Sequence, residues 1–92
     1  MVPAQQVVPG AVARLIAGYP HSAGKVEAAW HLAVGGGLAR MCTRLRDARG
    51  VIYVSVRDAG VATALESHRP VIERRLREVL GDHGRTFTVL AP

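Results

Sequence analysis

Basic side chains are the groups in this 92-residue sequence whose type and number most clearly indicate a chemistry. Eleven arginines and one lysine stand against seven acidic residues, which gives a net charge of +5 and a pI near 10.7. Because the guanidinium group makes planar, two-pronged contacts with phosphate, an excess of arginine favours an anionic partner such as a nucleic acid. The same composition also occurs where arginines are simply solvated, so the sequence leaves both interpretations open.

Two groups of arginines are candidate binding sites. The first surrounds an aromatic ring that could stack on a base, and it comprises Arg44, Arg46, Tyr53 and Arg57. The second lies on a predicted helix and comprises Arg74, Arg75 and Arg77. Carboxylates at Glu73 and Glu78 flank the second group and weaken its attraction for phosphate. We therefore predict that the first group binds nucleic acid and that the second binds a protein partner.

Residue types that could support catalysis or metal binding are present but are not brought together by spacing. Ser55, Asp58 and His68 fall on different predicted elements, so no nucleophile, base and orienting group are juxtaposed. Cys42 is the only cysteine, which excludes an intrachain disulfide, and we expect it to be a small buried side chain. No two of the four histidines have the spacing of metal ligands on one helix. These patterns predict a protein that is not an enzyme and that has no metal site and no cofactor.

Two glycine-rich stretches have the composition of nucleotide-binding loops but not their context. No strand precedes Gly35-Gly36-Gly37 and no Gly-Lys-Ser/Thr pattern follows it, so we expect the triplet to kink or break a helix. Gly81-Asp82-His83-Gly84 has G-x-x-G spacing, but it follows a predicted helix and carries an acidic residue. We expect a plain turn at this second stretch.

The strand from Val51 to Val56 determines where the first group of arginines lies. Its β-branched residues alternate between two faces, and residues 43–47 before it alternate in the same way. Gly50 suits a tight turn between them, which predicts a β-hairpin, and a third strand is expected from Arg85 to Leu90. The expected helix-covered face carries Leu45, Ile52, Val54, Val56, Phe87 and Val89. The expected open face carries Arg44, Arg46, Tyr53, Ser55, Arg57, Thr86 and Thr88.

Apolar residues at helical spacing predict helices on both sides of the hairpin. A short helix is expected from Ala11 to Gly18, and a second follows Ser22 as its N-cap. Trp30 on that second helix is expected in the core, with a stacking platform for nucleic acid or a partner contact as alternatives. After the hairpin, Asp58 is expected to cap a helix. Either a second helix begins at Pro70, or a single helix continues with a kink there.

The order ααββααβ predicts an α+β fold. A helical crossover before the last strand permits parallel pairing, so we expect a three-stranded mixed sheet with its helices on one face, in a two-layer sandwich. The length suits one domain, which we place at residues 11–92 after a loose leader at residues 1–10. No apolar run is long enough to span a membrane and no secretory signal is apparent, so we expect a cytoplasmic protein without a membrane partner.

This order of elements is that of a type II KH domain, and the residues resemble a narrower family. The pattern runs through Trp30, Val34-Gly35, Leu38-Ala39, the Val51 to Val56 strand, Leu65, Arg69-Pro70 and Leu80-Gly81. In these positions, across residues 11–90, the chain resembles the DciA family of bacterial replicative helicase loaders. The resemblance implies a KH-like domain that binds DNA and assists a DnaB-type helicase onto single-stranded DNA without being an ATPase.

The sequence departs from the family and from KH domains at three points. Val61 stands where many DciA proteins have a second tryptophan, so a stacking or docking role is not expected at that position. The sequence ends at Pro92 without the extension that many members carry, so we expect helicase engagement to be reduced or differently arranged. KH domains clamp nucleic acid with a G-x-x-G loop between their core helices. The corresponding junction here reads Ser67-His68-Arg69-Pro70, so we expect any DNA contact to lie outside the KH groove.

Charge and resemblance together predict a nucleic-acid-binding accessory protein of DNA replication. Its expected partners are single-stranded DNA and the replicative helicase, with no small-molecule substrate. Two alternatives stay open, a protein-interaction domain without nucleic-acid binding and an RNA-binding KH-like module.

Overall fold

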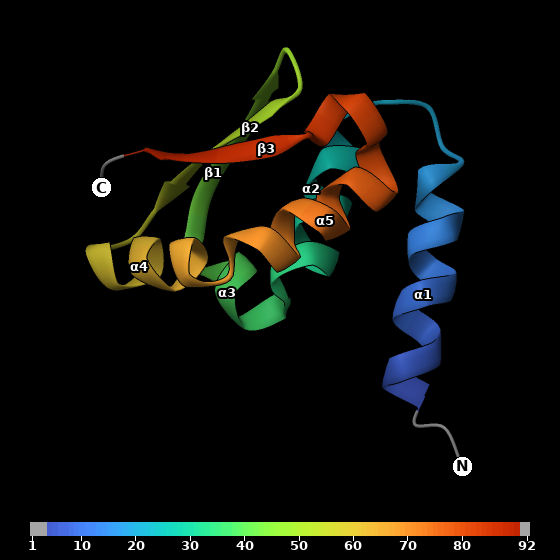
Figure 1. Ribbon diagram of the computed structural model, residues 1–92, viewed down its shortest axis with the longest axis horizontal. Coiled ribbons are helices and arrows are strands. Elements are labelled where there is room, and N and C mark those ends of the chain that lie inside the picture. The colour runs from blue at the N-terminus through green and yellow to red at the C-terminus, as the bar shows by residue number, and fades with distance from the viewer. Residues whose placement is uncertain (1–3, 91–92) are drawn as a thin grey trace.

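The fold is described by a computed structural model that covers residues 4–90, with residues 1–3 and 91–92 outside the described part (Figure 1). Along the chain lie α1 (Ala4–Ala17), α2 (Ala23–Val34), α3 (Gly36–Arg40), β1 (Cys42–Ala48), β2 (Val51–Val56), α4 (Ala59–Ser67), α5 (Arg69–Leu80), the 3₁₀ turn η1 (Gly81–Gly84) and β3 (Thr86–Leu90). The predicted α+β class and the predicted order of strands and helices are confirmed, and the arrangement is consistent with a KH-like fold.

The sheet has β2 at its centre. β1 and β2 form an antiparallel hairpin, and β2 pairs with β3 in parallel, as predicted. Arg49 and Gly50 form the turn with φ values of 53° and 80°, which are those of a type I′ turn whose twist matches that of the strands. A Cβ atom at Gly50 would also lie 2.6 Å from the backbone oxygen of Asp82. Glycine is therefore required at this position by backbone angle and by space.

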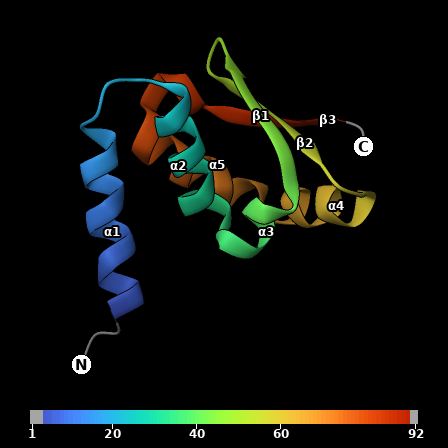
Figure 2. The ribbon, with the colours of Figure 1, turned by 180° about the vertical axis from the view of Figure 1, so that it is seen from behind.

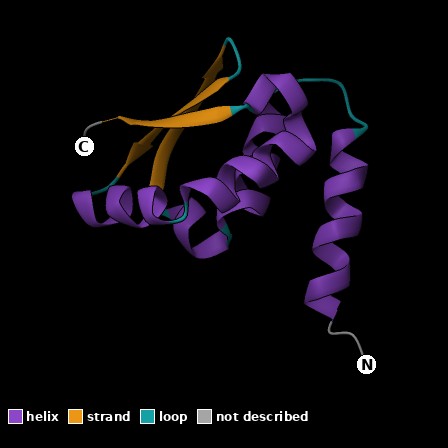
Figure 3. Ribbon diagram, in the orientation of Figure 1, coloured by secondary structure: helices purple, strands orange, loops and turns teal. Residues whose placement is uncertain are grey.

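Helices cover one face of the sheet and leave the other open (Figure 3). α2 and α5 pack against each other, α2 against β1 and α5 against β3, while α4 contacts β2. α1 packs on α5 and α2 and lies beyond them from the sheet (Figure 2). The predicted two-layer sandwich is thus correct, with α1 added outside the helical layer.

Trp30 lies at the centre of the core, between α2 and the sheet. Its side chain is 1% exposed and meets the ring of Phe87 edge to face, with 5.5 Å between the ring centroids. Its indole N–H donates to Sγ of Cys42 at 3.4 Å. Burial raises the pKa of the Cys42 thiol, although this hydrogen bond opposes the shift, so the thiol stays protonated at neutral pH. The predicted core role of Trp30 is confirmed.

The predicted helix boundaries are partly correct. Ser22 and Asp58 cap α2 and α4 by accepting hydrogen bonds from the backbone N–H groups of Lys25 and Val61. The glycine triplet breaks the helix, since α2 ends before Gly35 and α3 begins after it. α4 and α5 are two helices rather than one kinked helix.

The first helix is longer than predicted. α1 begins at Ala4 rather than at Ala11, so residues 4–10, which we expected to form a loose leader, are helical. Pro9 fixes φ at a value that a helix also uses and removes only one N–H donor, so a helix can contain it at a cost. Residues 1–3 of the expected leader lie outside the described residues.

Arg69 ties the start of α5 to the edge of β3. Its guanidinium donates to the backbone oxygen of Phe87 at 2.7 Å, to Glu66 at 2.6 Å and to Glu73 at 3.0 Å. It also lies 3.9 Å from the centroid of the Phe87 ring. The hydroxyl of Thr86 donates to the same Glu73 carboxylate. Thr86 is paired with Val51 and so belongs to the open face by register, as expected, but its hydroxyl reaches around the edge of the sheet to α5.

This network predicts a contribution to stability that acid removes. The hydrogen bond from Arg69 lowers the pKa of Glu66. Burial raises the pKa of Glu73, but hydrogen bonds from Thr86 and Arg69 outweigh burial and lower it. Because both carboxyl pKa values are lower in the folded than in the unfolded protein, the stabilisation is present above their ordinary pKa and is lost as the pH falls through the lowered values.

Thermal melts across the acidic range test this contribution. At neutral pH, Arg69→Met should lower the free energy of unfolding by about 1 to 3 kcal/mol, through the hydrogen bonds to Glu73 and the Phe87 carbonyl. The variant should also lose less stability than the parent between about pH 6 and pH 2. Parallel pH profiles for the two proteins would contradict this account.

Candidate nucleic-acid interface

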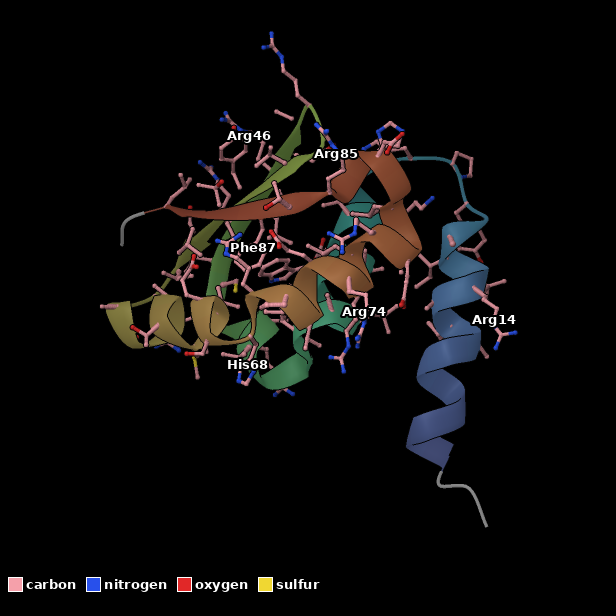
Figure 4. All side chains as sticks on the ribbon, viewed as in Figure 1. Arg14, Arg46, His68, Arg74, Arg85 and Phe87 are labelled. Carbon is pink, nitrogen blue, oxygen red and sulfur yellow. The ribbon has the colours of Figure 1, made fainter. Side chains whose placement is uncertain are left out.

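Arg44 and Arg46 lie on the open face of the sheet because the two-residue turn fixes the register of the hairpin. They are opposite Ser55 and Tyr53 on β2, and alternate residues of a strand share a face. The guanidinium of Arg46 lies 5.7 Å from the centroid of the Tyr53 ring, within the range of a cation–π contact. Figure 4 shows Arg46 on the side of the sheet away from α4 and α5.

A β-bulge lies near the start of β1, the strand that carries Arg44 and Arg46. The register shifts between Cys42 and Arg44, so Thr43 is the extra residue and Cys42 lies opposite Val56. Val56 belongs to the core face, and the thiol of Cys42 accordingly meets Trp30. The bulge thus turns a small apolar side chain inward at the beginning of β1 while the arginines that follow stay on the open face.

Arg57 extends the row of arginines beyond the end of β2. Its backbone N–H donates to the oxygen of Met41 at 3.1 Å, and its guanidinium contacts Sδ of the same methionine at 3.5 Å. By alternation from the buried Val56, Arg57 belongs to the face of Tyr53. Arg44 and Arg46 are one two-residue step, about 7 Å, apart on β1, and Arg57 follows the neighbouring strand β2 near the start of β1. The three arginines together form a row along the hairpin.

This row carries little compensating negative charge. Arg44, Arg46 and Arg57 are exposed, and within residues 11–90 none of them is paired with a carboxylate. The sequence was therefore right about which side chains come together with Tyr53 on the open face. Their contact with nucleic acid stays a prediction.

Sequence reasoning missed two further arginines at the turn end of the hairpin. Arg85 donates from Nη2 to the backbone oxygen of Arg49 at 3.1 Å and so lies against the turn of the hairpin (Figure 4). The backbone N–H of Arg85 donates to the oxygen of Gly50 at 2.9 Å. This placement depends on the parallel register of β2 and β3, which no local pattern in the sequence specifies.

The second group of arginines, on α5, is divided by the contacts of its members. Arg75 donates to the backbone oxygen of Ala33 at 3.1 Å and so binds the last turn of α2. Arg77 donates to the backbone oxygen of Arg85 at 3.3 Å. Arg74 is exposed on the helical side of the molecule (Figure 4). A protein-binding role for this group stays a prediction.

The junction of α4 and α5 is bridged by protein contacts. Arg69 links this junction to β3, and the stretch Gly81–Gly84 forms η1 after α5. Val61, at the position where many family members have tryptophan, is buried at the start of α4. These contacts favour a nucleic-acid interface away from this junction.

Residues 4–90 have neither a membrane-spanning helix nor a metal-binding cluster. No helix there is long and apolar enough to cross a membrane, and no group of three or more histidine, cysteine or acidic side chains could hold a metal ion. His21 donates a hydrogen bond from Nε2 to Oδ2 of Asp47 at 2.7 Å, and its ring stacks on that of His83 with 4.0 Å between the centroids. These three side chains join the loop before α2 to β1 and η1.

Comparison with known proteins identifies a family. The chain matches the family described as Dna[CI] antecedent, DciA, over residues 3–85. Neither the curated proteins nor the solved structures yielded a match. The matched span includes the hairpin and both groups of arginines. The chain therefore belongs to the DciA family.

Proposed function

We propose that this protein is an accessory protein of DNA replication that binds single-stranded DNA on its open sheet face while it assists loading of the DnaB-type replicative helicase. Membership of the DciA family supports the helicase-loading role, since this is a family of loading accessory proteins rather than of enzymes. The observation that supports DNA contact is the row of unpaired arginines beside Tyr53, among the described residues. The proposal includes a cytoplasmic location, where a replicative helicase of this kind works.

The proposed interaction has an electrostatic part and a stacking part. Arg44, Arg46 and Arg57 would neutralise successive phosphates of an extended strand, and the Tyr53 ring offers a surface on which a base can stack. Neither contact reads the edge of a base. Binding of this type is weak and has little sequence preference.

The face of α5 suits a protein partner better than a nucleic acid. Glu73 and Glu78 lie close to its arginines in sequence, and the pKa of Glu73 is lowered in part by the charge of Arg77. The potential of this face is therefore partly cancelled. We propose that Arg74, Arg75 and Arg77 contribute to docking on the helicase. Two of them, Arg75 and Arg77, are also held in position by backbone oxygens of the protein.

Salt dependence tests DNA binding directly. Three phosphate contacts predict a slope of about −2 in a plot of log affinity against log salt for a single strand, so affinity should fall about 20-fold between about 50 and 200 mM salt. Fluorescence anisotropy with labelled oligothymidine measures the slope. Binding that ignores salt would contradict the proposal, and no binding at low salt would favour the protein-interaction alternative.

Two matched measurements address the remaining alternatives. Tighter binding of oligouridine than of oligothymidine at the same salt would favour an RNA-binding module, since the 2′-hydroxyl distinguishes the two. Co-purification of a DnaB-type helicase with the tagged protein tests the helicase part of the proposal. If the two purified proteins form no complex when they are mixed directly, the helicase part of the proposal is contradicted.

A further inference from the structure

The two edges of the sheet differ in what covers them. The edge of β3 is occupied, because Arg69 donates to the backbone oxygen of Phe87 and Thr86 binds Glu73. The opposite edge belongs to β1, which pairs only with β2 in the sheet that the described residues form. An uncovered edge presents backbone N–H and C=O groups to which another strand can bind.

The register of the hairpin identifies the free groups. In a two-residue hairpin the residues that flank the turn form a hydrogen-bonded pair, and such pairs alternate along the ladder. Arg44 and Arg46 therefore direct their backbone groups toward β2. Leu45 and Asp47 direct theirs outward, and within residues 4–90 no hydrogen bond to these outward groups is found.

A groove of about 270 Å³ accompanies this edge on its helical side. It lies between β1 and α2, and its lining combines apolar side chains, such as Trp30 and Leu45, with the carboxylates of Glu27 and Asp47. A strand added to β1 would send every second side chain toward this groove and the others toward the open face. At these alternate positions the groove disfavours acidic side chains, because Glu27 and Asp47 line it, and accepts apolar ones beside Leu45 and Trp30.

The open face selects the remaining positions by charge. Side chains of the added strand opposite Arg44 and Arg46 would form cross-strand pairs with two exposed guanidinium groups, which favours carboxylates. Pairing of β1 with a second copy of itself would instead place arginines near arginines, which is unfavourable. We propose that the edge of β1 is a docking site for an extended peptide in which acidic and apolar residues alternate.

This docking site overlaps with the DNA surface but does not depend on it. The peptide would use Arg44 and Arg46 and should compete with single-stranded DNA for them. Its affinity would come from backbone hydrogen bonds to Leu45 and Asp47 as well, and DNA cannot form the same ladder. Changes to the backbone amides of the peptide or of β1 should therefore weaken peptide binding without weakening DNA binding.

A labelled peptide with the sequence Gly-Glu-Val-Glu-Val-Glu-Gly provides the first test. Two derivatives carry two N-methyl groups each, one on the two valine amides and the other on the amides of the last two glutamates, so that charge and composition match. Only one set of amides faces β1, so one derivative should bind about ten-fold more weakly and the other should retain the parent affinity. Equal losses, or no loss in either derivative, would overturn the proposal.

A protein variant provides the second test. Leu45→Pro removes an N–H that points away from β2, and an edge strand tolerates proline at such a position. Compared with Leu45→Ala, it should bind the peptide about five-fold more weakly, the effect of one lost hydrogen bond, while both bind oligothymidine equally. Equal peptide affinities would overturn the proposal, and failure of the wild type to bind oligothymidine would remove the DNA proposal alone. The methylated peptides decide the question even if Leu45→Pro does not fold.

Discussion

Replacement of Trp30 by alanine is expected to lower the free energy of unfolding by about 3 to 5 kcal/mol. The side chain is 1% exposed and fills the space between α2 and the sheet, where it meets Phe87. Its removal takes away the apolar burial of an indole and leaves a cavity that a close-packed core can only partly fill. Urea unfolding followed by circular dichroism measures the loss. A variant that keeps its melting temperature would show that Trp30 is not structural.

Two control variants separate the effect of burying the Trp30 ring from the effect of its hydrogen bond and from the effect of removing any aromatic side chain. Trp30→Phe keeps an aromatic ring but removes the donor to Cys42, so it should cost less than the alanine variant. Tyr19→Ala removes an aromatic side chain that is 53% exposed, and its effect should stay within about 0.5 kcal/mol. If Tyr19→Ala lowers the free energy of unfolding as much as Trp30→Ala does, the loss is not specific to the buried position of Trp30.

Reversal of charge at Arg44 and Arg46 together, to Glu, is expected to weaken binding of single-stranded DNA about 100-fold at moderate salt. Each reversal replaces a screened attraction of about 0.7 kcal/mol by a comparable repulsion, a change of about 1.4 kcal/mol per residue. Both side chains are exposed on the open face, so the melting temperature should change little. Anisotropy titrations at one fixed salt concentration provide the measurement. The slope of log affinity against log salt concentration should fall toward the value for a single phosphate contact, the one that Arg57 retains.

The matched control is a second double reversal on the other face. Arg74→Glu with Arg77→Glu changes net charge by the same amount but alters a helix that already carries Glu73 and Glu78. Arg75 is left intact because it binds the last turn of α2. The control should change DNA affinity by no more than a few-fold, an effect of overall charge. If the control abolishes binding and the sheet pair does not, the DNA surface is assigned to the wrong face, while the family assignment stands.

The sequence predicted the sheet well because its signals are local. Alternation in Val51 to Val56 identifies the buried face of β2, and Gly50 identifies a turn that only a few residue types can form. Once these two features are known, the faces of Arg44 and Arg46 follow from the two-residue period. The sequence alone was therefore enough to predict that Arg44 and Arg46 share the open face with Tyr53.

The contacts of the other arginines could not be predicted in this way. Arg69, Arg75 and Arg85 donate to backbone oxygens that are far from them in sequence, at Phe87, Ala33 and Arg49. Such contacts depend on how α5 packs against α2 and β3, and no local period records them. Charge alone therefore overestimated how many arginines are available to a partner.

The length of α1 shows a different limit. Val-Pro-Gly at residues 8–10 is typical of a chain break, yet the helix runs through it from Ala4. Proline costs the interior of a helix about 3 kcal/mol, and the side chains of α1 that pack against the core, Ala13 and Ile16, follow the Val-Pro-Gly stretch. The proline rule identified a residue that costs stability but not one that ends the helix.

The parallel pairing of β2 with β3 has a consequence for synthesis of the protein. The hairpin can form as soon as its own residues leave the ribosome, but β3 follows only after α4, α5 and η1. Until then one edge of β2 is open, and its sequence Val-Ile-Tyr-Val-Ser-Val is uncharged and rich in β-branched residues, as in segments that aggregate. Nascent chains that stall before Phe87 should therefore depend on chaperones, whereas chains that reach Leu90 bury this edge themselves.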